Sequence, residues 1–455
     1  MPSLLLTGAA VATVDAAGTE HATGHVLVDD GVVAAVGAGD PPPRLRERLP
    51  VGTRELDLRG HLVTPGLVNT HHHLYQWATR GFAVDSGLFD WLTTLYPLWA
   101  GLRAEDVEAA ARAGLARLAL TGCTTTTDHH YLHPRDGGDQ LTATVEAART
   151  VGLRFAPTRG SMDLGASAGG LPPDSVVEGV DAVLAATAEA VARHHAPSPG
   201  AMVRVGAAPC SPFSVSADLL RETAAQAAEL GIRRHTHLAE TADEEEFCAR
   251  VFGARPVQVM EDLGWLGPDV WLAHCVHLSD ADVAVLARTG SAVAHCPSSN
   301  ARLGAGVARA RDLLDAGVPV GLGVDGAASS EQGGLVDELR QMVYSARGRG
   351  GAAAMSARDA LRAATAGGAA CLGRDDVGSL EVGKRADLAV WDLTGLGHAD
   401  LDDPVVALVI GPTPPLRLLL VEGRVVVEDG ELRTTSEQRA VADLVAARRR
   451  LLARR

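Results

Sequence analysis

The chain has 455 residues, of which 46% are hydrophobic and 4% aromatic, a composition typical of a soluble α/β enzyme and unlike that of disordered or fibrous chains. Its 41 basic and 56 acidic residues give a formal charge of −15, so the surface as a whole repels nucleic acid and anionic lipid. We therefore expect a small-molecule partner, with no nucleic acid and no membrane involved.

The N-terminal stretch has no basic region followed by a long apolar run, and no 18 successive apolar residues occur anywhere. These features predict neither a signal peptide nor a membrane span. The six cysteines form no C-x-x-C pair, which argues against a zinc ribbon and against a disulfide framework. We expect a cytoplasmic protein.

Both ends of the chain carry short β patterns. Residues 1–61 contain alternating Val/Leu runs with a D-D-G turn, and a matching set returns at 386–393, 405–411 and 416–432. The simplest arrangement is one small β-sandwich formed from 1–61 and 376–455, the latter ending in a helix with terminal arginines.

The middle of the chain, 62–375, alternates short apolar runs with stretches of helical period. The eight runs are HLVTPGLVN, LTGCTTTTD, GLRFAPTRG, MVRVGAAPC, GIRRHTHLAE, VWLAHC, SAVAHCP and VPVGLGVD. Eight strand-helix units in series predict a TIM (β/α)8 barrel, so the fold class is α/β.

Each run carries a polar or reactive residue at or just beyond its C-terminal end. These residues are His71 with His73, Asp128, Arg159, Cys210, His237, His274, His295 and Asp325. The C-terminal ends of the strands form the active-site face of a TIM barrel, so we expect these side chains to surround its mouth.

Three consecutive histidines follow the first run. Side chains alternate along a strand, so His71 and His73 point to one side and His72 to the other. Any single histidine here could simply decorate a strand end, but His237 and Asp325 end two further runs and could converge on the pair. Three imidazoles and a carboxylate are ligands suited to Zn²⁺ with an open position for water.

His235 could compete with His237 for the ligand role, since the two share a strand face. We favour His237 because Glu240 follows it and can reach a metal-bound water or a substrate atom. His274, at the end of the sixth run, could hydrogen-bond the attacking oxygen as a neutral imidazole.

Five motifs together resemble the amidohydrolase superfamily, in its nucleobase-deaminase and triazine-hydrolase branch. They are P-G-x-x-x-x-H-x-H (65–73), H-x-x-E (237–240), LAHC (272–275), HCPSSN (295–300) and GLGVDGAASS (321–330). With the split β unit, the resemblance covers nearly the whole chain. More narrowly, HHHLYQ, GLFDWLTTLYPLWAGL and PTRGSMDLG resemble 8-oxoguanine deaminases, which release ammonia and urate.

The resemblance implies hydrolytic deamination of an amino-substituted, purine-like heterocycle, with 8-oxoguanine as first choice and guanine, isoxanthopterin or a hydroxytriazine as alternatives. It implies one divalent ion, Zn²⁺ or Fe²⁺, held by His71, His73, His237 and Asp325. Asp325 would accept a proton from the attacking water, Glu240 would protonate a ring nitrogen, and His274 would steady the attacking oxygen. We also expect a homo-oligomer.

Three residues near the predicted mouth are candidates to contact substrate. Gln76 could hydrogen-bond an amide edge of a purine, and Arg159 a ring carbonyl or an anionic tautomer. Each has a structural alternative, because Gln76 could cap a helix and Arg159 could pair with an acid such as Asp163. His129 could face the substrate or support the residues that do.

The segment GLGVDG (321–326) also satisfies the G-x-G-x-x-G pattern of nicotinamide-dependent oxidoreductases. That motif should open the first strand-helix unit, whereas this one comes at the eighth run with Asp325 inside it. An NAD(P)-dependent oxidoreductase therefore remains a remote alternative.

Overall fold

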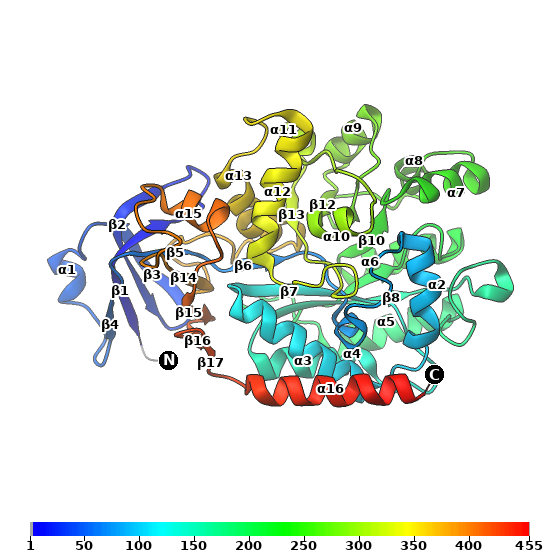
Figure 1. The fold of residues 1–455 in the computed structure, drawn as a ribbon, viewed down its shortest axis with the longest axis horizontal. Coiled ribbons are helices and arrows are strands. Elements are labelled where there is room, and N and C mark those ends of the chain that lie inside the picture. Colours follow the sequence, from blue (N-terminus) through cyan, green and yellow to red (C-terminus); the bar gives the residue numbers. More distant parts are fainter. Residues whose placement is uncertain (1–2, 455) are drawn as a thin grey trace.

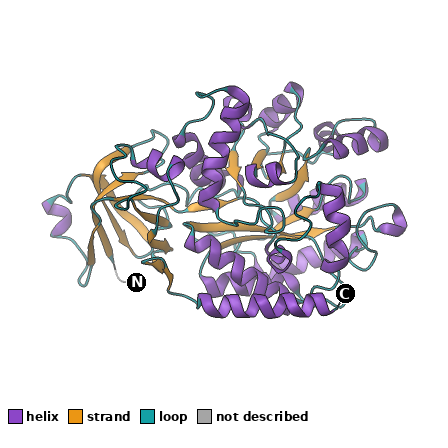
Figure 2. Cartoon of the chain, viewed as in Figure 1, coloured by secondary structure: helices purple, strands orange, loops and turns teal. Residues whose placement is uncertain are grey.

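The computed structural model describes residues 3–454. A closed barrel and a separate sheet make up the molecule, and the sheet takes strands from both ends of the chain. Figures 1 and 2 show the sheet beside the barrel, with helices around the strands of the barrel. Among residues 3–454, no helix is long and apolar enough to cross a membrane.

The barrel closes through eight parallel strands in chain order. They are β6 (Leu67–Asn69), β7 (Cys123–His130), β8 (Arg154–Ser161), β9 (Gly206–Pro209), β10 (Arg234–Leu238), β11 (Val270–His274), β12 (Ala292–His295) and β13 (Val320–Leu322). Each lies within or overlaps one of the eight apolar runs, so the predicted TIM barrel is confirmed.

Helices connect the strands around the outside of the barrel. They include α3 (Ala104–Leu120), α4 (Gln140–Val151), α5 (Val180–His194), α6 (Ala217–Leu230), α7 (Ala242–Phe252), α8 (Pro256–Asp262), α9 (Asp280–Thr289), α11 (Ala310–Asp315), α12 (Leu335–Gly350), α13 (Ala357–Arg362) and α14 (Gly368–Cys371), the last two joined by a π-helical turn, η3 (Ala363–Gly367). Side-chain caps set several starts: Ser216, Ser279 and Ser356 each accept a backbone N–H at the beginning of α6, α9 and α13.

Four elements lie over the C-terminal ends of the strands or in the loops that follow them: η1 (Leu74–Thr79), α2 (Leu88–Trp99), η2 (Ala166–Ala168) and α10 (Pro297–Arg302).

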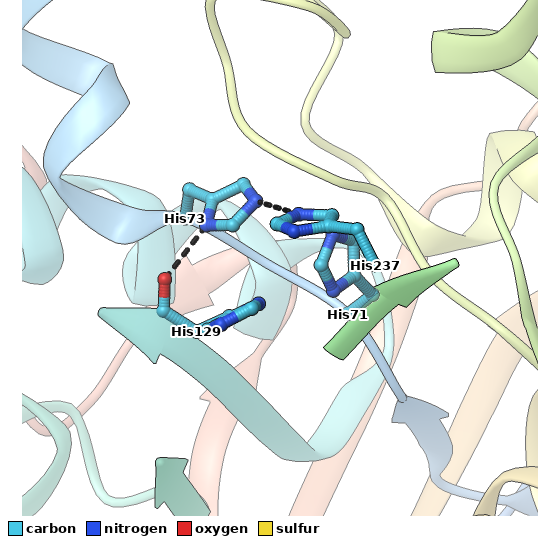
Figure 3. A group of neighbouring side chains, drawn as sticks. All are labelled: His71, His73, His129 and His237. Atoms are coloured by element: carbon cyan, nitrogen blue, oxygen red, sulfur yellow. Dashed lines mark hydrogen bonds between the residues drawn. The ribbon is translucent and has the colours of Figure 1, made fainter. Parts of the chain in front are cut away.

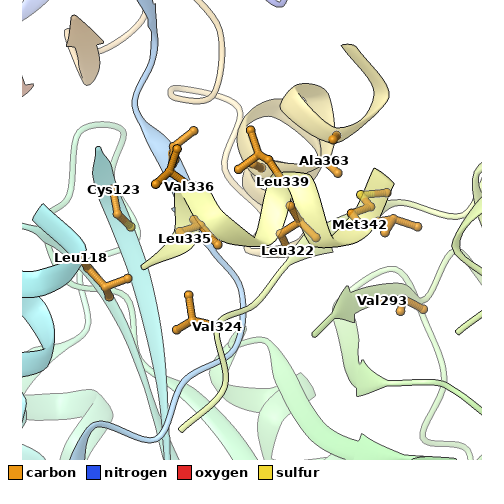
Figure 4. Close-up of a cluster of buried hydrophobic side chains, with 14 of the residues drawn as sticks. Leu118, Cys123, Val293, Leu322, Val324, Leu335, Val336, Leu339, Met342 and Ala363 are labelled. Atoms are coloured by element: carbon orange, nitrogen blue, oxygen red, sulfur yellow. The ribbon is translucent and has the colours of Figure 1, made fainter. Parts of the chain in front are cut away.

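Helix α12 illustrates how the helices are held to the barrel. Its buried residues Leu335, Leu339 and Met342 recur at helical spacing and form one apolar face. That face belongs to the same core cluster as Leu322 and Val324 at the last strand, as Figure 4 shows.

The second part is a nine-stranded sheet, in the order β17-β16-β15-β14-β5-β1-β2-β3 with β4 also paired to β1. Its strands are β1 (Leu4–Ala12), β2 (Glu20–Asp29), β3 (Val32–Ala38), β4 (Arg54–Asp57), β5 (His61–Pro65), β14 (Leu388–Asp392), β15 (Leu416–Val421), β16 (Arg424–Glu428) and β17 (Glu431–Leu432), with the short α1 (Pro43–Arg46) between β3 and β4. The prediction that both ends of the chain build one β unit is confirmed.

Alternation along β14 explains how the sheet joins the barrel. Leu388 and Val390 face the sheet's own core, whereas Ala389 and Trp391 belong to the core shared with the barrel. The buried Arg154 of β8 reinforces this junction, because its guanidinium pairs with Asp387 beside β14.

The boundary between the two parts differs from the expected position. Strand β5 (His61–Pro65) pairs with β1 and with β14, so the N-terminal share of the sheet extends four residues past residue 61. Only β6, after Gly66, enters the barrel.

The prediction of a strand at 405–411 is wrong, because Pro404–Ile410 form the helix α15. The Asp403 carboxylate accepts the N–H groups of Val405 and Val406 at 3.0 and 3.1 Å, and Pro404 occupies the first turn. A short apolar run without alternation is compatible with a strand or a helix, and the Asp403 N-cap favours the helix.

The expected C-terminal helix is present as α16 (Glu437–Ala453). It packs along α3. Two of its terminal arginines, Arg450 and Arg454, form salt bridges with the buried Asp106 of α3.

Candidate active site

Four buried side chains converge at the C-terminal mouth of the barrel: His71 and His73 after β6, His237 on β10 and Asp325 after β13. The Nε2 atoms of His73 and His237 lie 3.0 Å apart. Asp325 Oδ1 lies 3.3 Å from Nε2 of His71 and 3.4 Å from Nε2 of His73. Figure 3 shows the three imidazoles turned toward one another.

Backbone carbonyls fix the proton on two of these imidazoles. Nδ1 of His73 lies 2.7 Å from the carbonyl oxygen of His129, and Nδ1 of His237 lies 2.6 Å from that of Cys210. A carbonyl oxygen only accepts, so each Nδ1 carries the hydrogen and each Nε2 keeps a lone pair. The two Nε2 atoms therefore face each other with no proton between them.

His235 fixes the proton on His71 by a relay. Nδ1 of His235 lies 2.7 Å from the carbonyl oxygen of Trp271 and so donates to it, which leaves Nε2 of His235 to accept from Nδ1 of His71 at 2.8 Å. Nε2 of His71 is then an unprotonated, buried atom with no hydrogen-bond partner.

Burial keeps these rings neutral. It lowers the pKa of His73 to about 3 and also lowers the pKa values of His71 and His237, so none is charged near neutral pH. Three imidazole lone pairs and the Asp325 carboxylate then repel one another unless a cation lies among them. This donor set fits a divalent ion such as Zn²⁺.

Asp325 is held rigidly in a strained backbone conformation, with φ of +59°. Its Oδ2 accepts from Ser299 Oγ at 2.5 Å and from Ser329 Oγ at 2.9 Å, and its Oδ1 accepts from the Gly326 N–H at 2.7 Å. The carboxylate is thus oriented from several directions before any ligand arrives.

A narrow cavity opens beside the four converging groups. It is lined by His73, Gln76, Leu88, Trp91, Leu92, Tyr96, Tyr131, Cys210, Phe213, His237, Glu240, His274, Leu303, Asp325 and Ser329. One face of α2 supplies the outer wall, and the indole N–H of Trp91 fixes that wall by donating to the carbonyl oxygen of Ala328 at 3.0 Å. Aromatic and aliphatic walls with few polar groups suit a planar heterocycle.

A sequence model of the amidohydrolase family matches residues 62–426, most of the chain. The chain belongs to this family.

Individual relatives agree with that assignment. The amidohydrolase is 44% identical to an 8-oxoguanine deaminase of Pseudomonas aeruginosa over 90% of each chain. It is 37% identical to an isoxanthopterin deaminase of an unknown prokaryotic organism, covering 94% of this chain and 93% of that one. An atrazine chlorohydrolase of Arthrobacter aurescens TC1, solved in complex with zinc, superposes with a TM-score of 0.92 at 33% identity, covering 98% of this chain and 100% of the other.

Two further ionisable groups of this amidohydrolase reach the cavity. Burial, opposed by His274, raises the pKa of Glu240 to about 7. For His274 itself burial acts to lower the pKa, but the nearby carboxylates outweigh it and the pKa is raised. Glu240 Oε2 lies 3.7 Å from Nε2 of His274, and Nδ1 of His274 donates to Asn300 Oδ1 at 2.9 Å.

Glu244 holds the loop that carries Glu240, a contact not predicted from sequence. Its two carboxylate oxygens accept the N–H groups of Ala239 and Glu240, each at 2.9 Å. Ala239 has a φ of +51°, so this clamp stabilises a sharp turn directly after β10. The sequence feature that could have indicated this contact is the position of Glu244 in the first turn of α7, where a carboxylate can accept backbone N–H groups.

The structure brings one of the three predicted substrate contacts into the cavity. Gln76 lines it, with Oε1 accepting from the Ala328 N–H at 3.3 Å. Arg159 lies outside the cavity, because its Nη2 pairs with both carboxylate oxygens of Glu178 at 2.7 Å. Asp163, the acid first considered for that pairing, instead accepts from Ser216.

His129 lies behind the converging imidazoles and does not line the cavity. Its ring stacks on that of His237 with centroids 4.7 Å apart, and its Nε2 lies 3.0 Å from the carbonyl oxygen of Ala208. Together with its carbonyl contact to His73, this places His129 as a support for two of the four groups.

Proposed function

We propose that this amidohydrolase hydrolytically deaminates 8-oxoguanine, giving urate and ammonia. The observation that carries the proposal is a pair of buried carboxyl groups with opposite protonation preferences beside the divalent-ion set. Glu240 has its pKa raised to about 7, while Asp325 has its pKa lowered well below 3.8. Such a pair provides an acid and a base in one site. The 44% identity to an 8-oxoguanine deaminase supports the choice of ring.

His71, His73, His237 and Asp325 would hold the divalent ion. Bound there, the ion supplies Lewis-acid chemistry that makes water a nucleophile at neutral pH.

Asp325 is suited to accept the proton of the attacking water. Burial acts to raise its pKa, but contact with His71 outweighs burial and lowers it, and the hydrogen bonds from Ser299, Ser329 and Gly326 favour the ionised form. His274, hydrogen-bonded to Asn300, faces the same space and would hold the attacking oxygen.

Glu240 is suited to donate a proton to the ring nitrogen next to the amino-bearing carbon. With a pKa of about 7, a large fraction of it is protonated at neutral pH. Water adds to that carbon, the C–N bond to the amino group breaks, and the leaving nitrogen departs as ammonia after receiving a proton relayed by the carboxyl groups. The sum is 8-oxoguanine and water giving urate and ammonia.

Gln76 is our candidate for recognition of a ring carbonyl. Because its Oε1 accepts from the Ala328 N–H, its Nε2 is the group available to donate into the cavity. Aromatic walls from Trp91, Tyr131 and Phe213 would sandwich a flat ring. Arg159 has no part in this proposal because Glu178 engages it.

Ammonia release from 8-oxoguanine, guanine, isoxanthopterin and a hydroxytriazine tests the proposal. We expect the highest kcat/KM for 8-oxoguanine, because a site that pairs a polar group discriminates against an analogue lacking it. Gln76→Glu replaces a donor by an acceptor of equal size and should lower kcat/KM for 8-oxoguanine roughly tenfold or more. Gln258→Glu, an exposed position on α8, is the matched control. Faster turnover of guanine or a triazine would reject 8-oxoguanine as the substrate.

We also propose a homo-oligomer in the cytoplasm. Light scattering on the purified protein would give the oligomeric state directly, and a monomer at micromolar concentration would contradict it.

A further inference from the structure

A second cavity, of about 430 Å³, lies at the opposite end of the barrel from the mouth. It is formed where β8, β9, β10 and β11 begin, and its lining includes Ala156, His195, Arg204, Ile232, Arg233, Trp271, Leu372 and Gly373. We call it the base cavity. None of the groups assigned to the proposed chemistry reaches it.

Two arginines of the base cavity have no carboxylate partner among residues 3–454. Arg204 donates to the carbonyl oxygens of Gly373 and Ser198 at 3.1 and 3.2 Å, and Arg233 donates to those of Cys371 and Pro268, each at 3.1 Å. Carbonyl oxygens carry only partial charge, so two positive charges remain uncompensated.

Both arginines lie against the same residue, Gly373. Arg204 Nη1 contacts the carbonyl of Gly373, and the Nη1 and Cδ atoms of Arg233 lie within 3 Å of where a Cβ on Gly373 would be. Nε of Arg204 is buried without a hydrogen-bond partner. An unpaired buried donor costs free energy.

The acids near the base cavity are engaged elsewhere. Nε and Nη2 of Arg234 donate to the carboxylate of Asp269, and Nε and Nη2 of Arg374 donate to the carboxylate of Asp376. Asp375 is exposed and pairs with neither free arginine. A chain with 15 more acidic than basic residues thus leaves Arg204 and Arg233, two arginines of one cavity, without a salt bridge to any residue in the range 3–454.

His195 adds a third donor. Its Nδ1 lies 3.1 Å from the Val205 nitrogen and 3.3 Å from the Val205 carbonyl oxygen; when Nδ1 makes the shorter contact and accepts from the N–H, Nε2 carries the proton in the neutral ring. Burial lowers the pKa of His195 and favours that neutral form. The remaining lining is mainly apolar and includes Ala156, Ile232, Leu372 and the ring of Trp271; its acidic residue, Asp269, is paired with Arg234.

We propose that the base cavity is a binding site for a small organic phosphate, a phosphoryl dianion carried on an apolar or planar body. The two guanidinium groups match a dianion in charge, and Nη2 of Arg233, which donates to none of these carbonyl oxygens, supplies a donor for a phosphate oxygen. The volume exceeds that of inorganic phosphate alone, and the apolar wall accounts for the remaining space.

Calorimetric titration of the metal-loaded enzyme with phenyl phosphate, inorganic phosphate and benzyl alcohol tests this. We expect phenyl phosphate to bind more tightly than inorganic phosphate and the neutral alcohol not to bind. No binding of either phosphate would overturn the proposal.

Substitutions locate the site. Arg204→Gln and Arg233→Gln should each weaken phenyl phosphate binding roughly tenfold or more, since each removes a charged hydrogen bond, while Arg44→Gln, exposed on α1, should leave it unchanged. If a Gln variant does not fold, Arg204→Lys and Arg233→Lys keep the charge but lose the fork and should weaken binding less. Binding that is insensitive to both positions would place the phosphate at the mouth and reject the base cavity as its site.

Discussion

The two ends of one barrel collect opposite chemistry. At the mouth, His71, His73, His237 and Asp325 present lone pairs with no proton between them. At the base, Arg204 and Arg233 present donors with no carboxylate. The mouth is therefore complete only with a cation and the base only with an anion. The same strands serve both because residues at and after their C-terminal ends line the mouth, whereas residues at and before their N-terminal ends line the base.

Removing a mouth ligand should have the largest effect. His71→Ala should reduce bound divalent metal, measured by elemental analysis of the purified protein, from about one ion per chain to trace amounts and abolish turnover. His195→Ala at the base should keep both. Metal retained in the His71 variant would break the contrast between the two ends.

A substitution of Glu240 tests proton transfer at the mouth while leaving the metal ligands unchanged. Glu240→Gln should lower kcat by roughly 10²- to 10⁴-fold, the usual weight of acid catalysis, with metal content and melting temperature maintained. Glu222→Gln, exposed on α6, serves as the control. If metal were lost instead, Glu240 would belong among the ligands.

His235 lies between the two ends, since it orients His71 on one side and its ring stacks on Trp271, with centroids 4.5 Å apart, on the other. His235→Phe keeps the stacking but removes the acceptor that fixes the proton on His71. Metal affinity, measured by competition with a chelator, should fall roughly 10- to 100-fold. His21→Phe in β2 is a matched substitution far from the barrel, and an equal loss there would reject the relay.

The smallest predicted effect concerns stability against pH. Burial, opposed by contact with Ser298, raises the pKa of Glu338 near the mouth from 4.5 to about 8. Between these values the folded state holds a proton that the unfolded state has lost, so this group's contribution to stability falls as pH rises. Glu338→Gln should therefore gain stability relative to the native protein across that interval, by more than about 1 kcal/mol.

Asp376 near the base should show the reverse sign. Burial acts to raise its pKa, but Arg374 outweighs burial and lowers it, so its contribution is present above 3.8 and is lost as pH falls. Urea unfolding of the native protein, Glu338→Gln and Asp376→Asn from well below pH 3.8 up to pH 8 measures both. Parallel pH profiles for the two variants would contradict the comparison.

Sequence patterns predicted the barrel because eight short apolar runs alternate with stretches of helical period, a signal independent of exact boundaries. They also predicted the four converging groups, since alternation places His71 and His73 together and the barrel fold joins distant strand ends. Alternation alone did not separate His235 from His237, because both share a strand face, and the choice of His237 rested on Glu240, which follows it.

Other features depended on tertiary contacts that the sequence does not encode locally. Arg159 forms a salt bridge with Glu178, which lies in the irregular loop after β8. The cavity-lining residues Tyr131, Phe213 and Leu303 come from three separate loops. For α15, the Asp403–Pro404 pair was a readable helix start that the apolar run obscured.

The sheet built from both ends also has a consequence for synthesis. Strand β5 (His61–Pro65) ends up between β1 and β14, yet roughly 320 residues of chain separate Pro65 from Leu388. At about 5 to 20 residues per second, ribosomes need on the order of 15 to 65 s to deliver β14. During that interval the apolar edge formed by Leu62 and Val63 has no strand beside it and can pair with other nascent chains. The barrel that emerges meanwhile supplies part of the native cover for the face carrying Leu62, so prompt barrel closure protects the N-terminal strands from aggregation.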